Sequence, residues 1–387
     1  MRIAKPFHEI GDPVPGKGSP ALSVLFITRA SLFAVKGGDT TQVVKTAQAL
    51  QQLSVRVDIR LCNDKSIVYS IYDLIHFFNI GHPADMLGHI RMSGLPYVVS
   101  TIYVDYSKPE DRRRSGIKDL LLNGLGRNAQ EYLKTVGKAV LRHERIMDRN
   151  YLWMGHKRSV KKVLRDAAVL LPNSANEYKR LVGSYGISKE HHVVPNAADG
   201  LLFNCSREEF SRKDRQMVLC VARIELLKNQ LNLIRALNGS PYDLYLVGSP
   251  APNHFGYYKA CKKISASNIH FISEMKQEEL VQLYKKAKVH ILPSWFETTG
   301  LASLEALYCG CNIVVTERGD TKEYFDSEHC IYCDPASPDS IRSAVDLAAS
   351  QDPDISHIEW MRSVFNWEKA GAITLEAYRQ VLMNTKQ

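Results

Sequence analysis

The sequence predicts an α/β protein of two domains, each built on a doubly wound parallel sheet. The chain has 387 residues, which is too long for one ordinary core and favours two domains of under 200 residues each. Short apolar runs of strand character alternate with amphipathic helical runs, which is typical of parallel sheets covered by helices. The alternation stops once, at a polar stretch over 196–216, and then begins again.

The first domain is expected over 21–196, after an N-terminal tail at 1–20. The tail has no apolar run of the kind that signal peptides carry. A helix is predicted over 43–53, because its apolar residues recur at spacings of three and four. The apolar runs that predict strands of this domain lie at 21–28, 56–62, 72–79, 96–104, 167–174 and 191–196.

The second domain is expected over 197–365, and an amphipathic run over 366–387 predicts a final helix. The strands of this domain are predicted at 217–224, 242–248, 268–273, 289–293 and 311–317. Ligands of doubly wound sheets bind beyond the carboxyl ends of the strands. We therefore expect a site in a cleft between the two domains.

Composition indicates a cytoplasmic globular protein. Apolar residues make up 45% and charged residues 24% of the chain, and no apolar run approaches the roughly 18–20 residues that span a bilayer. The eight cysteines are expected to be reduced, as in other large cytosolic proteins. The close pairs Cys309 with Cys311 and Cys330 with Cys333 lack the glycine-rich turns of zinc ribbons, so we predict no metal site.

The positive charge of the chain belongs to one segment of the first domain, residues 108–165. The net charge is +9, whereas this segment alone has 16 Lys/Arg and 6 Asp/Glu, a charge of +10. One interpretation is a solvated helical insert, and another is a surface that meets an anionic membrane or a lipid-diphosphate-linked acceptor. Nucleic-acid binding is disfavoured because no nucleic-acid motif accompanies the charge.

The most informative motif covers residues 293–310, where a short strand is followed by a loop and then a helix. The start of a helix has unpaired N–H groups and a partial positive charge, so Thr299, Gly300 and Leu301 are placed to hold a phosphate. Glu297 in the loop and Glu305 on the helix can accept hydrogen bonds from sugar or ribose hydroxyls. The motif predicts a nucleotide-sugar site.

Two cations provide a second signal. Arg223 and Lys228 follow the first strand of the second domain and precede its helix. A guanidinium and an ammonium at such a turn suit a diphosphate, although solvated charges at a helix start are common. The diphosphate interpretation is favoured because the Glu297 loop follows a later strand of the same predicted sheet.

The order of these motifs resembles the second half of glycosyltransferase family 4, whose members are retaining enzymes of the GT-B fold. The resemblance covers roughly residues 21–105 and 165–385. In such folds the final helix crosses back to the first domain. The motifs that carry the resemblance are Arg223, Lys228-Asn229, Gly248 after a strand, FETTGLASLEALYCG (296–310) and VPNAADGLLF (194–203).

The resemblance implies roles residue by residue. Arg223 and Lys228 would neutralise the leaving diphosphate, Glu297 would face the donor sugar, and these three are the implied catalytic residues. Glu305 would hold the ribose, and Met275 would lie beside the base. The donor-binding residues implied are Gly37, Gly38, Gly248, Met275, Thr299, Gly300, Leu301 and Glu305. The two cations do what a metal does elsewhere, so no cofactor is expected besides the UDP- or GDP-linked donor.

The residues expected on the acceptor side of the site differ from the pattern of the family. Its members usually have a histidine at the end of a first-domain strand, where this chain has Tyr103 and Asp105. A tyrosine hydroxyl can bind a sugar but does not readily take a proton near neutral pH. Tyr103, Asp105 and His76 are the acceptor-side candidates, with His82 as an alternative and a structural role for either histidine left open.

The resulting prediction is a hexosyltransferase of the retaining, metal-independent type. It would move a sugar from a nucleotide-sugar to a saccharide or lipid-linked saccharide, as in polysaccharide or glycoconjugate synthesis, in the cytoplasm or on the inner face of the membrane. One alternative is a GT-B-fold epimerase, which would turn over the donor without an acceptor. Another is a non-catalytic nucleotide-sugar-binding protein. The base, the sugar and the acceptor are left open.

Overall fold

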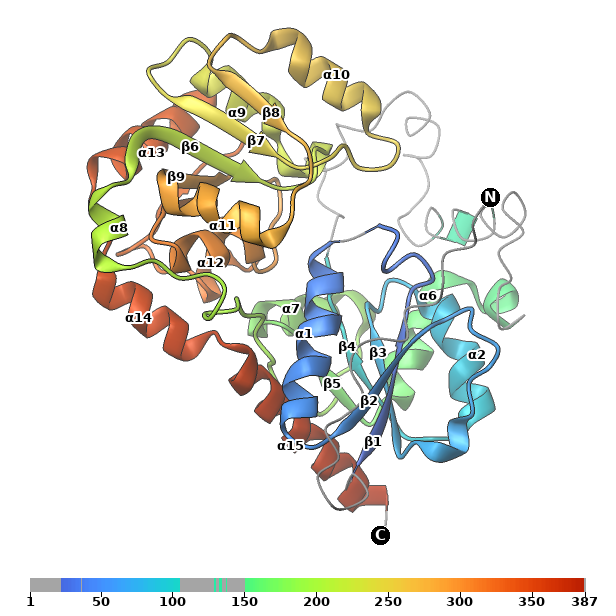
Figure 1. Cartoon of the computed structure of the whole chain (residues 1–387). Helices are drawn as coiled ribbons and strands as arrows, with labels where there is room; N and C mark the ends of the chain where they lie inside the picture. The colour runs from blue at the N-terminus through green and yellow to red at the C-terminus, as the bar shows by residue number, and fades with distance from the viewer. Residues whose placement is uncertain are drawn as a thin grey trace, which may run out of the picture.

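The computed structural model describes residues 22–35, 37–104, 129, 132–133, 137 and 150–385, and shows two α/β domains (Figure 1). The first domain is blue to green in Figure 1, and the second is yellow-green to orange. The expected tail at 1–20 and most of the basic segment at 108–165 lie outside the described residues.

The first domain contains a five-stranded parallel sheet in the order β2-β1-β3-β4-β5. The predicted run at 191–196 does not form a strand, and His191 makes only an isolated bridge to Leu170. The run at 96–104 leaves the sheet after Ser100, and Ile102 has a φ of 42°. The strands are β1 (Ser23–Thr28), β2 (Arg56–Leu61), β3 (Leu74–Phe78), β4 (Tyr97–Ser100) and β5 (Val169–Leu171).

Helices cover both faces of this sheet, because alternate residues of its buried strands point to opposite sides. On β1, Val24 and Phe26 pack toward α1 and α15, whereas Leu25 and Ile27 belong to the core under the other helices. The helices are α1 (Gly38–Gln52), η1 (Tyr69–Ile71), α2 (Pro83–Ser93), α6 (Asn150–Asp166) and α7 (Ala175–Tyr185), together with α15 (Trp367–Thr385) from the end of the chain.

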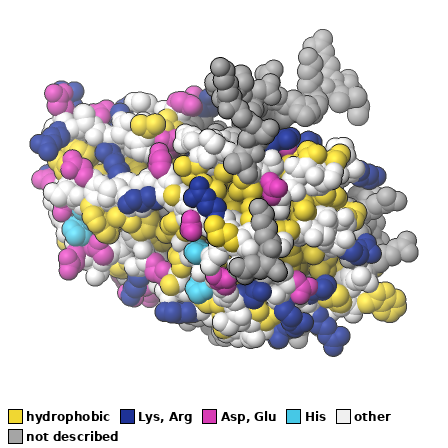
Figure 2. Space-filling model, turned by 90° about the horizontal axis from the view of Figure 1, so that it is seen from below, with side chains coloured by type: hydrophobic (Ala, Val, Ile, Leu, Met, Phe, Trp, Pro, Cys, Tyr) yellow, Lys and Arg dark blue, Asp and Glu magenta, His cyan; other side chains and the backbone are white. Residues whose placement is uncertain are grey.

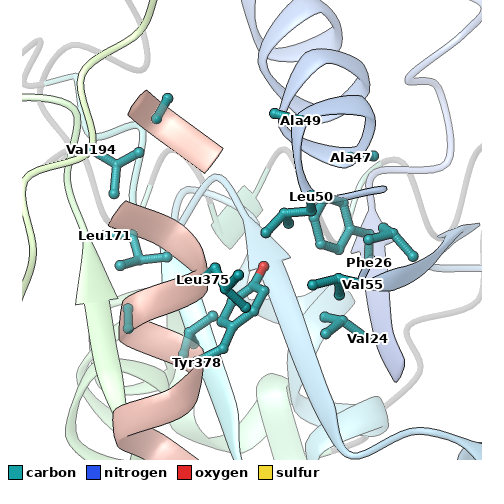
Figure 3. Packing of buried hydrophobic residues seen from close by; sticks show 14 of the residues in the cluster. Val24, Phe26, Ala47, Ala49, Leu50, Val55, Leu171, Val194, Leu375 and Tyr378 are labelled. Atoms are coloured by element: carbon teal, nitrogen blue, oxygen red, sulfur yellow. The ribbon is translucent and has the colours of Figure 1, made fainter. Parts of the chain in front are cut away.

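Helix α15 joins the end of the chain to the first domain. Leu375 and Tyr378 point from this helix into the core formed by β1 and α1 (Figure 3). Gly371 faces α1 so closely that a Cβ atom at this position would lie 2.7 Å from Cβ of Ala49. The two helices therefore pack at a distance that only a glycine at 371 allows without a shift.

The second domain contains a six-stranded parallel sheet in the order β11-β10-β9-β6-β7-β8. Its helices α9, α10 and α13 share one core, and α11, α12 and α14 share the core on the opposite face. The strands are β6 (Asp214–Val221), β7 (Asp243–Val247), β8 (Ile269–Ile272), β9 (Ala287–Leu292), β10 (Asn312–Thr316) and β11 (Ile331–Cys333). The helices are α8 (Arg207–Ser211), η2 (Leu226–Lys228), α9 (Gln230–Leu237), α10 (Phe255–Ile264), α11 (Gln277–Lys286), α12 (Leu301–Tyr308), η3 (Thr321–Glu323), α13 (Pro338–Ser350) and α14 (Ile355–Val364).

Each sheet has one point at which the order of its strands reverses. In the first sheet this switch point lies between β1 and β3, and in the second it lies between β6 and β9. Chains leave neighbouring strands in opposite directions at such a point, which opens a crevice beyond the carboxyl ends of the strands. The two strongest sequence motifs follow β6 and β9, so the fold brings both to one crevice.

The described surface carries mixed charge. On the coloured part of the face in Figure 2, basic and acidic side chains are interspersed among hydrophobic ones. Within the described part of the chain, no helix combines the length and hydrophobicity that crossing a membrane requires.

Candidate active site

Lys228 and Glu297, which belong to separate sequence motifs, form an ion pair beyond the carboxyl edge of the second sheet. Lys228 Nζ lies 2.6 Å from Glu297 Oε2, and Ser294 Oγ donates to the same oxygen at 3.0 Å. Glu297 is only 7% exposed, so the attraction is stronger than it would be in water. An ammonium group has three donors, which leaves two for the oxygens of a bound phosphate.

Asn229 fixes the turn that presents Lys228. The residue ends η2 in the left-handed region, with a φ of 58°. Its side-chain Nδ2 donates to the carbonyl oxygens of Pro293 at 3.0 Å and Pro335 at 2.7 Å. These bonds tie the loop after β6 to the loops after β9 and β11, and so hold Lys228 beside Glu297.

Arg223 and Gly248 lie in the adjoining loops after β6 and β7. The Arg223 side chain is 44% exposed, and its guanidinium lies 3.5 Å from Glu225. Gly248 has a φ of 144°, and a Cβ atom there would lie 2.2 Å from the carbonyl oxygen of Ala222. The close approach of the two loops therefore requires a glycine at position 248. Its predicted contact with a donor stays a prediction.

The start of helix α12 offers free backbone donors. Gly300 precedes the helix with a φ of 73°, which glycine adopts without strain. Within the described residues, the N–H groups of Thr299, Gly300 and Leu301 donate to no other group. Thr299 is buried, and its Oγ1 accepts a hydrogen bond from Asn196 Nδ2 at 3.0 Å. This arrangement suits a phosphate at the start of the helix.

Glu305 lies one turn into α12 and is half-buried. Tyr284, a fully buried residue of α11, donates its hydroxyl to Glu305 Oε2 at 3.3 Å. Burial raises the pKa of Glu305 to about 7, while the tyrosine hydrogen bond and the charge of Lys45 oppose that rise. Lys45 belongs to α1, so a cation of the first domain acts on a carboxyl group of the second.

The Gly37–Gly38 loop of the first domain faces the start of α12. A Cβ atom at Gly38 would lie 3.4 Å from Leu301 Cδ1, so the two predicted motifs meet across the domains. Gly37 caps α1, and an ion pair of 2.6 Å between Arg29 and Asp39 holds the loop that leads into this helix. A phosphate at α12 would therefore lie next to the backbone of the first domain.

Met275 lies in the loop between β8 and α11, at the far end of the row of carboxyl-edge loops. Its side chain is partly buried against the apolar cluster that contains Tyr284. It supplies an apolar surface on the second domain. Its predicted contact with a base stays a prediction.

The structure corrects the placement of two acceptor-side candidates. His76 is fully buried in β3, with Nδ1 2.6 Å from Tyr378 Oη and Nε2 2.8 Å from Ser100 Oγ. Burial lowers the pKa of His76 to about 3, so it is a neutral core histidine. Tyr103 is 4% exposed, and its hydroxyl donates to Ser184 Oγ at 2.9 Å in the core of the first domain. Asp105 lies outside the described residues.

The cysteines of the predicted strands are buried and none forms a disulfide. Among the described residues, the group with ligand atoms close enough for a metal is Asp326 and His329, which lie between η3 and β11, together with His357 of α14. It includes none of the candidate donor residues.

Comparison with known proteins finds a family match within the second domain. Residues 204–358 match the family described as glycosyl transferases group 1. The chain is 26% identical over 244 residues to an MMP alpha-(1->4)-mannosyltransferase of Mycolicibacterium hassiacum, a match covering 59% of this chain and 58% of the relative. It is 28% identical over 170 residues to a D-inositol 3-phosphate glycosyltransferase of Mycobacteroides abscessus, a match covering 41% of this chain and 38% of the relative. The chain thus spans about half the length of these curated relatives.

Solved structures share the whole two-domain architecture. Sucrose-phosphate synthase from Thermosynechococcus elongatus aligns with a TM-score of 0.71 at 16% identity, covering 94% of this chain and 100% of that one. HepE from Anabaena aligns with a TM-score of 0.67 at 14% identity, covering 92% of this chain and 99% of that one. The predicted GT-B fold is confirmed. The match to the glycosyl transferases group 1 family lies within the second domain, over residues 204–358, and the solved structures show that the whole chain has the GT-B fold.

Proposed function

We propose that the protein is a retaining, metal-independent glycosyltransferase that moves a sugar from a nucleotide donor to a saccharide or lipid-linked saccharide. The observation that carries the proposal is the Lys228–Glu297 pair beside the free start of α12, at the switch point of the second sheet. In the proposed complex, Lys228, Arg223 and the N–H groups of residues 299–301 would hold the diphosphate. HepE, with the same fold, has been solved with UDP and glucose, which supports a nucleotide-sugar donor.

The proposed reaction breaks the bond between the sugar C1 and the phosphate oxygen and forms a bond from C1 to an acceptor oxygen. Positive charge develops on the sugar, and negative charge develops on the departing diphosphate. Fixed cations and N–H groups at the diphosphate stabilise this charge more strongly than they stabilise the bound substrate. Glu297 lies beside Lys228, where its carboxylate faces the positive charge on the sugar in the proposed complex.

A panel of nucleotide sugars tests the donor. We expect one of the UDP-, GDP-, ADP- or dTDP-sugars to stabilise the fold by about 2.7 kcal/mol at 100 times its Kd. For a chain of this size, that corresponds to a rise in Tm of several degrees. The corresponding free sugar serves as a control and should leave Tm unchanged, and inorganic phosphate should raise Tm less than the nucleotide sugar does. A panel in which no nucleotide sugar raises Tm would contradict a donor site.

We also propose that the basic segment binds an anionic membrane surface. In its described part, α6, the exposed Trp153 (87%) lies before a kink at Gly155, and the exposed cations Lys157, Arg158 and Lys162 follow the kink. An indole ring and neighbouring cations are the groups that bind at a lipid interface. Such a surface would hold the enzyme near a lipid-linked acceptor.

Charge reversal on α6 tests the membrane proposal. Replacing Lys157, Arg158 and Lys162 together with glutamate should weaken co-sedimentation with phosphatidylglycerol vesicles at least 100-fold, since each cation contributes about 1 kcal/mol near such a surface. The matched control reverses the exposed cations of α10, namely Lys259, Lys262 and Lys263. Equal binding of both variants and the wild type to these vesicles would contradict the membrane proposal.

A further inference from the structure

The loop after β10 holds the backbone of Glu297. The N–H of Glu297 donates to the carbonyl of Arg318 at 3.0 Å, and the N–H of Asp320 donates to the carbonyl of Glu297 at 2.9 Å. Gly319 lies between them with a φ of 111°, and a Cβ atom there would lie 1.9 Å from the Glu297 carbonyl oxygen. The loop and Glu297 therefore form one rigid unit.

The same loop is held by the first domain. Asp320 is only 1% exposed, and both of its carboxylate oxygens accept hydrogen bonds from the guanidinium of Arg180 on α7, with Nη2–Oδ2 at 2.7 Å. Glu323 accepts hydrogen bonds from the N–H groups of Ala175 at 2.8 Å and Asn176 at 2.6 Å, at the start of α7. These are charge-assisted contacts, the stronger class of hydrogen bond.

Helix α7 is in turn anchored to the carboxyl edge of the first sheet. Its fully buried Glu177 accepts hydrogen bonds from the Thr101 hydroxyl, from the N–H of Tyr103 at 2.8 Å and from the N–H of Asn173 at 3.0 Å. Thr101 and Tyr103 follow β4 directly. A chain of contacts therefore links the first sheet through Glu177 and α7 to Arg180, and from there to the Glu297 loop.

Arg180 also contacts the residue before Glu297. Its guanidinium carbon lies 5.1 Å from the centre of the Phe296 ring, within the range of a cation–π contact. Arg180 thus binds the two segments that flank Glu297, namely Phe296 and Asp320. The turn that presents Lys228 is held within the second domain by the Asn229 side chain, which donates to the carbonyl of Pro293 and makes no contact with Arg180.

We propose that Arg180 and Asp320 form a positioning pair that orients the first domain over Glu297, and that this pair sets the rate of transfer without contributing to nucleotide binding. The inference rests on the proposed function of the Glu297 site. Neither side chain contacts the donor: the pair acts through Phe296 and the backbone of Glu297. Its disruption should leave the diphosphate contacts intact while the acceptor and the donor sugar lose their alignment.

Arg180→Lys tests the pair, because lysine keeps a positive charge opposite the buried Asp320 but cannot make the planar, bidentate contact of a guanidinium. We expect kcat to fall 5- to 20-fold, while the Kd for the nucleotide sugar that stabilises the wild type changes less than 2-fold. Spin labels on introduced surface cysteines, one in each domain, should give a broader distance distribution in the variant. The native cysteines are all buried, which favours selective labelling.

Two further variants keep the test decisive. Arg180→Met with Asp320→Leu removes both charges and leaves neither unpaired, so it should fold and show the same loss of kcat. Lys285→Met breaks an ion pair with Glu209 inside the second domain and should change neither kcat nor the distance distribution. Unchanged kcat, a parallel loss of donor affinity or an unaltered distance distribution in Arg180→Lys would overturn the inference. If no nucleotide sugar binds the wild type, the proposed function fails, and the distance distributions alone decide the role of the pair.

Discussion

Replacing Lys228 with alanine is expected to lower the rate of sugar transfer by about 100- to 1,000-fold, the loss typical for a group that stabilises charge in a transition state. The ammonium lies 2.6 Å from Glu297 and has two further donors for the leaving diphosphate. Because charge on that diphosphate grows as the bond to the sugar breaks, kcat should fall more than donor affinity. Steady-state kinetics with the donor identified by thermal shift measures both.

The Lys228 variant also leaves a buried carboxylate without its cation, so folding must be separated from chemistry. Among the described residues, the Glu297 carboxylate would keep the Ser294 hydroxyl as its side-chain partner, and the loss of the cation should cost about 1–3 kcal/mol of stability. Adding Glu297→Gln should restore much of the stability but none of the activity. Lys322→Ala, which breaks an exposed pair of 2.8 Å with Glu317, is the matched control and should leave both unchanged. Full activity in Lys228→Ala would contradict the assignment of the leaving-group site.

The meeting of Lys228 and Glu297 could be predicted from the sequence, although 69 residues separate them. Both residues follow buried strands of one alternating α/β segment, and the ends of parallel strands lie at one edge of the sheet. Apolar runs such as that of β9, which is buried along its full length, identify the strands without any long-range information. The loops at that edge therefore carry the chemistry that their residues indicate.

The acceptor side could not be predicted in the same way, because a strand position does not reveal which neighbour covers it. His76 belongs to β3, and its partner Tyr378 comes from a helix 302 residues later in the chain. Tyr103 follows β4, but the chain leaves the sheet at Ile102 and buries the tyrosine instead. In both cases tertiary packing decides whether a polar residue faces a ligand or the core.

Two parts of the site gave only weak sequence signals. Gly319-Asp320 follows β10 as Lys228 follows β6, and a glycine shortly after a parallel strand could have marked this loop. Tyr284 faces inward from a helix and looks like any core aromatic residue, so its hydrogen bond to Glu305 follows only from the packing of α11 against α12. The contact between Arg180 and Asp320 depends on how the two domains are oriented, which no local pattern determines.

The affinity for the donor is expected to depend on pH through Glu305. The pKa of this carboxyl group is raised to about 7, so it is mostly protonated at pH 6 and mostly ionised at pH 8. In the proposed complex, the ionised form could accept hydrogen bonds from both hydroxyls of the donor ribose, whereas the protonated form would lose part of that capacity. Donor binding should therefore strengthen as the pH rises through 7, by about 10-fold between pH 6 and pH 8.

Glu305→Gln isolates this effect, because glutamine keeps the size of the side chain but has no titratable proton. We expect donor binding about 10- to 100-fold weaker than in the wild type at pH 8, the loss of one or two charge-assisted hydrogen bonds, with a flat dependence on pH. Tyr284→Phe should shift the wild-type transition to higher pH, because the hydrogen bond from its hydroxyl holds the pKa of Glu305 down. Titration calorimetry from pH 6 to 8.5 measures all three proteins. A pH dependence that persists in Glu305→Gln would assign it to another group and leave Glu305 without the proposed role at the ribose.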